Sequence, residues 1–309
     1  MSTRLVLLVL CLGAIGCGEH ATAPAPAEVG IPPGVSGRIA YLAGSYLAVL
    51  DLATGAKTII RRDLLPLAYP DSYARIHWTA RGDSIVTVVQ PLKCGVLPGD
   101  MSFRYCFPDS IRTRTFAANG PDSIGGATPC DVVIGESQDG RFACLASDGA
   151  GIYIGQSPVY LDSLMSGCGT LGDQVSLAHD WSFVVVSSQV DSAWGCGLYR
   201  AALPAGPRQL IAWSDTIEFR RPVVSPLGDR IAFEGSGPTG GTWIGVVNAD
   251  GTNLHRVASG WDGAPSWSPD GKWVVFARHE EAIWLATPEG GVERKILSFG
   301  TEPSWSPTP

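Results

Sequence analysis

The residues of this sequence that could act as acids, bases or metal ligands are few and scattered. The densest group is His279-Glu280-Glu281, which could transfer protons or bind a metal ion. It lacks a second histidine at helical spacing, and the apolar segments on either side predict a solvated loop between two strands. The sequence also lacks G-x-S-x-G, H-E-x-x-H and P-loop motifs. We therefore assign no catalytic residue and no metal ligand.

The N-terminal segment has the composition of an export signal. Arg4 precedes an apolar run, Leu5 to Leu12, which is too short to span a bilayer as a stable helix. The small residues of Ala14-Ile15-Gly16 precede Cys17, an arrangement that resembles a bacterial lipobox. The resemblance implies a lipoprotein signal peptide, residues 1–16, cleaved before Cys17, whose thiol is then diacylated. An ordinary secretory signal with a chance cysteine is the alternative.

Residues 17–35 are expected to form a tether that follows the lipidated cysteine. Ala21 to Ala27 is rich in alanine and proline, and this composition favours an extended, semi-rigid spacer. Acyl chains would hold the protein at a membrane of the cell envelope without a transmembrane helix. Gly18 stands where many inner-membrane lipoproteins carry aspartate. By that analogy we expect the periplasmic side or the surface of the outer membrane, if the source has two membranes.

Six of the eight cysteines remain once Cys11 leaves with the signal and Cys17 carries lipid. An even number in an exported chain predicts disulfides. No C-x-x-C pair is present, which argues against a zinc site. Proximity in the sequence suggests the pairs Cys94–Cys106 and Cys168–Cys196, which leaves Cys130–Cys144 over.

One stretch, Ala264 to Phe276, predicts two strands and the turn between them. Pro269 cannot donate to a strand ladder and ends the first strand. Asp270-Gly271 is expected to supply the positive φ angles of a tight turn, and the apolar run Trp273 to Phe276 predicts a strand buried on both faces. Weaker copies recur at intervals of about 40 residues, which with about four strands per unit is typical of a β-propeller. The copies are centred on Ala80, Gln138, His179, Pro226 and Pro307.

The repeat also predicts how the ring closes. The first unit begins at Arg38 without an opening strand, whereas the last copy, Glu302 to Pro307, is an opening strand alone. The fold class is therefore predicted to be all-β, a six-bladed β-propeller over residues 36–309, closed by the C-terminal strand pairing into the first blade. Leu92 to Cys106 is expected to be an insertion.

The repeat resembles that of TolB-type propellers, in which Pro-Ser-Trp-Ser-Pro-Asp-Gly precedes an apolar strand. Pro265 to Gly271 matches this signature in full, and Pro303 to Pro307 matches its first half. The signature positions here are Trp267, Ser268, Pro269, Asp270, Gly271, Trp305, Ser306 and Pro307. The resemblance implies the propeller fold and a role in binding a protein or peptide. TolB itself carries an α/β domain ahead of its propeller, and this sequence shows only a signal and a spacer there.

Charge and aromatic content narrow the class of partner. A net charge of −7 argues against a nucleic-acid surface, which would be basic. Most of the 10 tryptophans occupy repeat positions and are predicted to pack between blades. Trp194 and Trp261 fall in loops instead, so they are the candidate binding surface.

We expect a monomeric, non-enzymatic binding module of the cell envelope, with an envelope protein or peptide as its partner and no cofactor. The alternative is a six-bladed propeller hydrolase, lactonase-like or sugar-processing, with a metal such as calcium in its channel. That alternative needs acidic or histidine side chains that converge from several blades, and sequence spacing does not test convergence across a ring.

Overall fold

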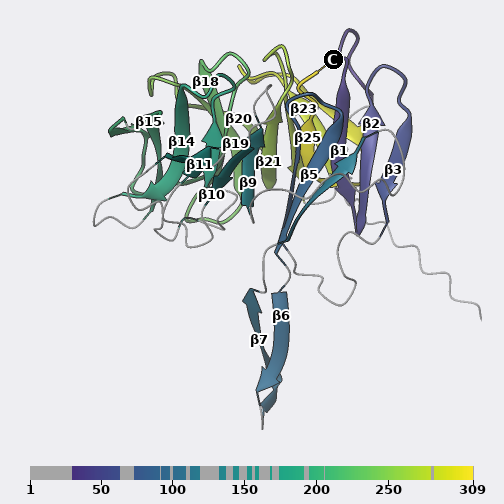
Figure 1. Ribbon diagram of the computed structural model, residues 1–309, viewed down its shortest axis with the longest axis horizontal. Helices are drawn as coiled ribbons and strands as arrows, with labels where there is room; N and C mark the ends of the chain where they lie inside the picture. The colour runs from purple at the N-terminus through teal and green to yellow at the C-terminus, as the bar shows by residue number, and fades with distance from the viewer. Residues whose placement is uncertain are drawn as a thin grey trace, which may run out of the picture.

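Short apolar segments separated by glycine-rich turns fold here into antiparallel sheets. The computed structural model describes residues 30–62, 73–90, 92–97, 100–108, 112–118, 132–136, 142–145, 152–154, 157–159, 168, 174–190, 195–204, 206–279 and 282–308. Every regular element in these ranges is a strand. The sheets form the six blades of a β-propeller (Figure 1), as the sequence predicts.

The first three blades include the inserted hairpin. From the channel outwards, blade 1 contains β25 (Thr301–Trp305), β1 (Arg38–Ala43), β2 (Tyr46–Asp51) and β3 (Lys57–Arg61). Blade 2 contains β4 (Tyr73–Trp78), β5 (Ser84–Gln90) and β8 (Arg112–Ala117), and between β5 and β8 lies a separate hairpin of β6 (Leu92–Leu97) and β7 (Asp100–Pro108). Blade 3 contains β9 (Val132–Glu136), β10 (Phe142–Leu145), β11 (Ile152–Ile154) and β12 (Ser157–Val159).

The other three blades each have four strands. Blade 4 contains β13 (Val175–Leu177), β14 (Phe183–Gln189), β15 (Cys196–Ala202) and β16 (Arg208–Ala212). Blade 5 contains β17 (Glu218–Val224), β18 (Arg230–Ser236), β19 (Thr242–Asn248) and β20 (His255–Ser259). Blade 6 contains β21 (Asp262–Trp267), β22 (Val274–Arg278), β23 (Ala282–Ala286) and β24 (Glu293–Leu297).

Blade 1 closes the ring with strands from opposite ends of the sequence. β25 pairs antiparallel with β1, and Trp305 lies opposite Ile39 in the register. The predicted closure by the C-terminal strand is therefore confirmed. The pairing covers the inner edge of β1, which would otherwise expose unpaired backbone groups.

The turn at Asp270 differs in detail from the sequence prediction. Gly271 has a positive φ of 68°, but Asp270 does not, so the expectation that both residues supply positive φ is wrong for Asp270. Its carboxylate stabilises the turn instead, because Oδ1 accepts hydrogen bonds from Ser268 Oγ at 2.7 Å and from the backbone N–H of Lys272 at 3.1 Å. Aspartate is common in turns for this reason.

Adjacent blades are joined by an arginine that stacks on a tryptophan. Between blades 5 and 6 the Arg230 guanidinium lies 5.1 Å from the Trp267 ring centroid and donates to the Gly271 carbonyl at 2.8 Å. The indole N–H of Trp267 donates to the Val223 carbonyl at 2.9 Å. The apolar ring is therefore buried while its polar atom is satisfied.

The same arrangement joins blades 1 and 2. The Arg38 guanidinium lies 4.8 Å from the Trp78 ring centroid and donates to the Gly82 carbonyl. The indole N–H of Trp78 donates to the Ser304 carbonyl at 2.9 Å. Trp78 and Trp267 thus pack between blades, as their repeat positions predict.

The end of the expected tether lies against the folded body. Val35 is buried in the core cluster shared by blades 6 and 1, and Ile31 packs against that cluster. The backbone N–H of Gly30 donates to the Lys295 carbonyl of β24 at 3.0 Å. Residues 30–35 are therefore fixed to the propeller, and only residues before Gly30 are left to act as a spacer.

Candidate binding sites in the channel and on one face

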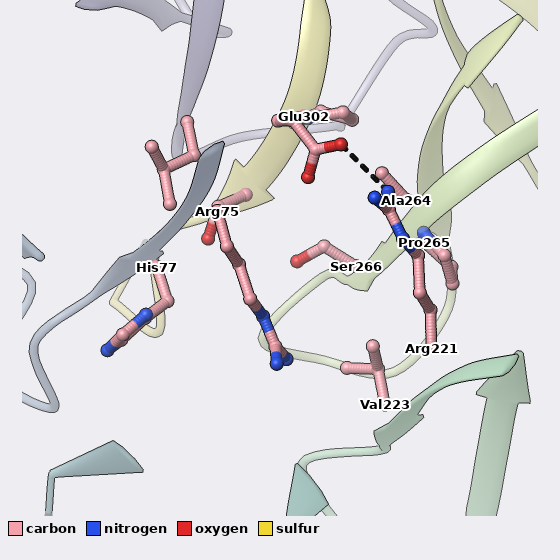
Figure 2. A pocket seen from close by; sticks show the side chains of 11 residues that line it. Arg75, His77, Arg221, Val223, Ala264, Pro265, Ser266 and Glu302 are labelled. Atoms are coloured by element: carbon pink, nitrogen blue, oxygen red, sulfur yellow. Dashed lines mark hydrogen bonds and ion pairs between the residues drawn. The ribbon is translucent and has the colours of Figure 1, made fainter. Parts of the chain in front are cut away.

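The innermost strands of four blades line a pocket in the central channel. The cavity, called here the channel pocket, has a volume of about 100 Å³ and is lined from β4, β17, β21 and β25. Its polar lining residues are Arg75, His77, Arg221, Ser266, Glu302 and Ser304, and Figure 2 labels the first five. None of them was singled out by the sequence analysis.

Strand alternation places two of these side chains in the channel. Arg75 and His77 flank Ile76 on β4, and Ile76 is buried in the core between blades 1 and 2. Because successive side chains of a strand point to opposite faces, Arg75 and His77 project from the other face, into the pocket.

A backbone irregularity presents further residues to the pocket. Three innermost strands have a non-glycine residue at positive φ directly before a proline: Arg221 at 48°, Ala264 at 52° and Glu302 at 48°. The strand register shifts at each of these positions. Such bulges re-aim side chains, and Arg221 and Glu302 both line the channel pocket. The recurring residue-plus-proline pattern was the sequence signal that could have identified them.

Arg221 is neutralised by carboxylates. Its Nη1 lies 2.7 Å from Glu302 Oε1, and its Nε lies 3.9 Å from Glu234 Oε2. Glu302 belongs to blade 1 and Arg221 to blade 5, so the ion pair crosses the channel past blade 6 (Figure 2). Both side chains are about one-fifth exposed, which makes the pair more than a screened surface contact.

Arg75 and His77 have a different electrostatic setting. Among the described residues, no carboxylate lies within ion-pair distance of Arg75. His77 Nε2 is buried and has no hydrogen-bond partner in the described part of the chain. Burial, assisted by the positive charge of Arg75, lowers the pKa of His77 to about 3, so the imidazole is neutral at pH 7.

Exposed aromatic side chains occupy equivalent loops on one face of the disc. Trp213, Trp261 and Phe299 follow the outermost strands β16, β20 and β24, and they are 43%, 61% and 56% exposed. These loops lead into the next innermost strand, so in a ring of antiparallel blades they lie on the same face. The β6–β7 hairpin follows β5 on this face and projects from the disc (Figure 1). We call this surface the aromatic face.

Trp261 is held in place although its side chain is exposed. Its backbone is at a positive φ of 61°, and its carbonyl accepts a hydrogen bond from the His279 N–H at 3.0 Å. Its ring lies beside Gly241, where an added Cβ would be 3.7 Å from the indole. Trp194, the other predicted surface tryptophan, lies outside the described residues. Trp213 and Phe299 were missed because single aromatics between strands are indistinguishable in sequence from core residues.

The cysteines divide between described and undescribed parts of the chain. A disulfide joins Cys168 to Cys196, whose Cα atoms are 5.6 Å apart. Cys94 lies opposite Cys106 in the backbone register of the β6–β7 hairpin, the arrangement that the expected pairing needs. Cys144 is disulfide-bonded, whereas Cys130, the partner suggested by the sequence, lies outside the described residues. Cys17, the predicted site of lipidation, also lies outside them.

The described residues contain neither a cluster of metal ligands nor a helix suited to cross a membrane. Within the described ranges, no group of three histidine, cysteine, aspartate or glutamate side chains is arranged to hold a metal ion. His279 is described, but Glu280 and Glu281 lie outside the described residues. No helix in the described part of the chain has the length and apolarity needed to cross a membrane.

Comparison with known proteins identifies the type of propeller. The Tol-Pal system protein TolB of Zymomonas mobilis subsp. mobilis is 40% identical over 77 residues, which cover 22% of this chain and 17% of that protein. The crystal structure of TolB from Acinetobacter baumannii superimposes with a TM-score of 0.58 at 16% sequence identity, covering 89% of this chain and 68% of that one. The chain has a TolB-type β-propeller. No protein-family model matches it.

A TolB-type propeller does not by itself define an activity. The tricorn protease superimposes with a TM-score of 0.55 at 15% identity, covering 89% of this chain and 26% of the protease. At this identity the likeness shows the fold alone. The sequence match to the Zymomonas protein spans less than a fifth of that protein's length, so it does not transfer the activity of the whole protein.

Proposed function

We propose that this chain is a lipid-anchored, non-enzymatic binding module of the bacterial cell envelope, and that its aromatic face binds a protein or peptide partner. The observation that carries the proposal is the set of exposed aromatics, Trp213, Trp261 and Phe299, in equivalent loops. Tryptophan and other large aromatics dominate the energetics of protein interfaces, and they bury a large area with few rotatable bonds. The similarity to a Tol-Pal system protein supports an envelope role.

The opposite face has a different composition. Leu227 is 75% exposed in the β17–β18 turn, and Leu254 is 43% exposed in the β19–β20 turn, both on the face away from the hairpin. These are aliphatic side chains, whereas the aromatic face presents flat rings and a projecting hairpin. The asymmetry supports one binding face and supplies a matched control on the other.

The proposed anchor constrains how the module is held. Diacylated Cys17 would insert in a membrane surface, and Gly30 is already bonded to the edge of blade 6. Only the residues between Cys17 and Gly30 would then separate the lipid from the disc. A fully extended chain advances at most about 3.5 Å per residue, so the propeller would stay within roughly 45 Å of the membrane.

The experiment is crosslinking and pull-down from native membranes with the full-length chain. Wild type is expected to recover a specific envelope protein, and Cys17→Ala is expected to lose it. Trp261→Ala should weaken the recovered interaction by roughly 2 kcal/mol, about thirtyfold, in a titration with the purified partner. Leu227→Ala, on the other face, should leave it unchanged. Recovery of no specific protein with wild type, or equal losses in Trp261→Ala and Leu227→Ala, would contradict the proposal.

The hydrolase alternative is tested by metal analysis of the purified protein. A metallohydrolase would hold calcium or zinc at one equivalent per chain after exhaustive dialysis. Such a result would favour the alternative and would direct the search toward lactone and sugar substrates.

A further inference from the structure

Arg75 differs from the other arginines that point into the body of the propeller. Arg221 is paired with Glu302 in the same channel, and Arg278 makes a two-point contact with the buried Asp262, at 2.6 Å and 3.0 Å. Among the described residues Arg75 has no carboxylate at ion-pair distance, although it lines the channel pocket. A cation in a partly dehydrated site is costly unless an anion compensates it.

Figure 2 shows the direction of the Arg75 side chain. The guanidinium points away from the Glu302 carboxylate, which is instead directed toward Arg221. The carboxylate of Glu302 is therefore already paired with Arg221, and the N–H donors of Arg75 remain directed into the channel. A planar guanidinium presents donors in a fork that fits the two oxygens of a carboxylate or phosphate.

A second donor lines the same cavity. Ser266 Oγ accepts a hydrogen bond from the backbone N–H of Trp305 at 3.0 Å. Among the described residues this hydroxyl donates no hydrogen bond of its own, so its hydrogen is available to a ligand. The apolar wall is formed by Val223 and Pro265, which strengthen electrostatic contacts by limiting water.

We propose that the channel pocket binds an oxyanion, a carboxylate or phosphate group, held by the Arg75 guanidinium and the Ser266 hydroxyl. The site is separate from the aromatic face, so it does not depend on the proposed function. The cavity volume of about 100 Å³ admits a single charged group and excludes a folded segment. His77 lines the pocket beside Arg75, and it serves as the reporter of occupancy.

The test is a titration of the purified chain with two small probes. N-acetylglycine represents a peptide carboxylate, inorganic phosphate represents a phosphate group, and sodium chloride at equal ionic strength is the control. With isotopically labelled histidine, the NMR signals of His77 are expected to move in a saturable manner with at least one probe, with a Kd on the order of 1 mM. The probe that binds more tightly identifies the carboxylate or the phosphate source.

The decisive variant is Arg75→Gln, which should weaken probe binding by about tenfold or more. The matched control is Arg81→Gln, an exposed arginine on the β4–β5 turn, which should bind as wild type does. Arg75→Lys keeps the charge but loses the fork, and it should retain intermediate affinity. If near-ultraviolet circular dichroism shows that Arg75→Gln does not fold, the affinity of Arg75→Lys for the probes becomes the deciding measurement. Absence of a saturable shift in wild type, or wild-type affinity in the deciding Arg75 variant, would overturn the proposal.

Discussion

Protonation of His77 should make this propeller sensitive to acid well above the pH at which carboxylates titrate. The pKa of His77 is lowered to about 3 in the folded chain from an ordinary value of 6.5, chiefly by burial and also by Arg75. Between these values the unfolded chain binds a proton that the folded chain does not. The free energy of unfolding therefore falls as the pH drops from 6.5 toward 3.

The size of the effect follows from the pKa difference. One pKa unit corresponds to about 1.4 kcal/mol, so the full window is worth roughly 5 kcal/mol. Most carboxylates titrate below pH 5, and the interval from pH 7 to 5 isolates the histidine contribution, about 2 kcal/mol. His77→Gln keeps a polar side chain in the channel pocket but removes the titrating group.

The assay is urea unfolding of wild type and His77→Gln at pH 7 and pH 5. The other histidines are common to both proteins and cancel in the difference. Buffers should contain neither carboxylate nor phosphate, since an oxyanion in the pocket would favour protonated His77 and mask the effect. Wild type is expected to lose about 2 kcal/mol more than the variant on acidification. An equal loss in both proteins, within about 0.5 kcal/mol, would refute the reasoning.

Three further predictions concern the blades and their joints. Cys168 and Cys196 are 28 positions apart in the sequence, and their disulfide closes that loop. Replacing both with serine should lower the free energy of unfolding by about 3–4 kcal/mol, measured by urea unfolding. Arg230→Met should cost roughly 1–2 kcal/mol because it removes the stack on a tryptophan and a hydrogen bond, whereas Lys272→Ala, at a side chain 77% exposed, should cost under about 0.5 kcal/mol. Equal effects of these two changes would disprove the role given to the stack. Gly82→Ala should lower the free energy of unfolding by about 1 kcal/mol or more, because Gly82 is at φ +67° and the added Cβ would meet Thr308 Oγ1. Thermal unfolding measures the change, and an unchanged melting temperature would show that the turn adapts to alanine.

The fold was accessible from sequence because its signals are local. The segment from Trp267 to Gly271 specifies a strand end and a turn within five residues, and its spacing along the chain sets the number of blades. Ring closure followed because the unpaired opening strand near Trp305 and the incomplete first unit near Arg38 complement each other. Even the error at Asp270 was a local one, since the turn formed at the expected place by a different use of the same side chain.

The channel pocket was not accessible in the same way. Arg221 and Glu302 are 81 positions apart, and nothing in their neighbourhoods indicates that they meet. The residue before a proline is normally extended, so the recurring residue-plus-proline pattern marks these positions but does not by itself predict the positive φ that aims the two side chains inward. Arg75 and His77 alternate with an apolar residue, which predicts a strand but not whether its polar side faces solvent or a channel.

Closure of blade 1 by β25 has a consequence for synthesis of the protein. On the ribosome β1 emerges first and β25 last, with roughly 250 residues made between them, which takes on the order of tens of seconds. During that time the nascent chain carries an open strand edge on β1 that its own partner does not yet cover. The ring stays open at β1 until β25 has been synthesised. A stalled ribosome or a premature stop would therefore release a fragment with an exposed strand edge on β1. Such a fragment aggregates unless a chaperone covers that edge.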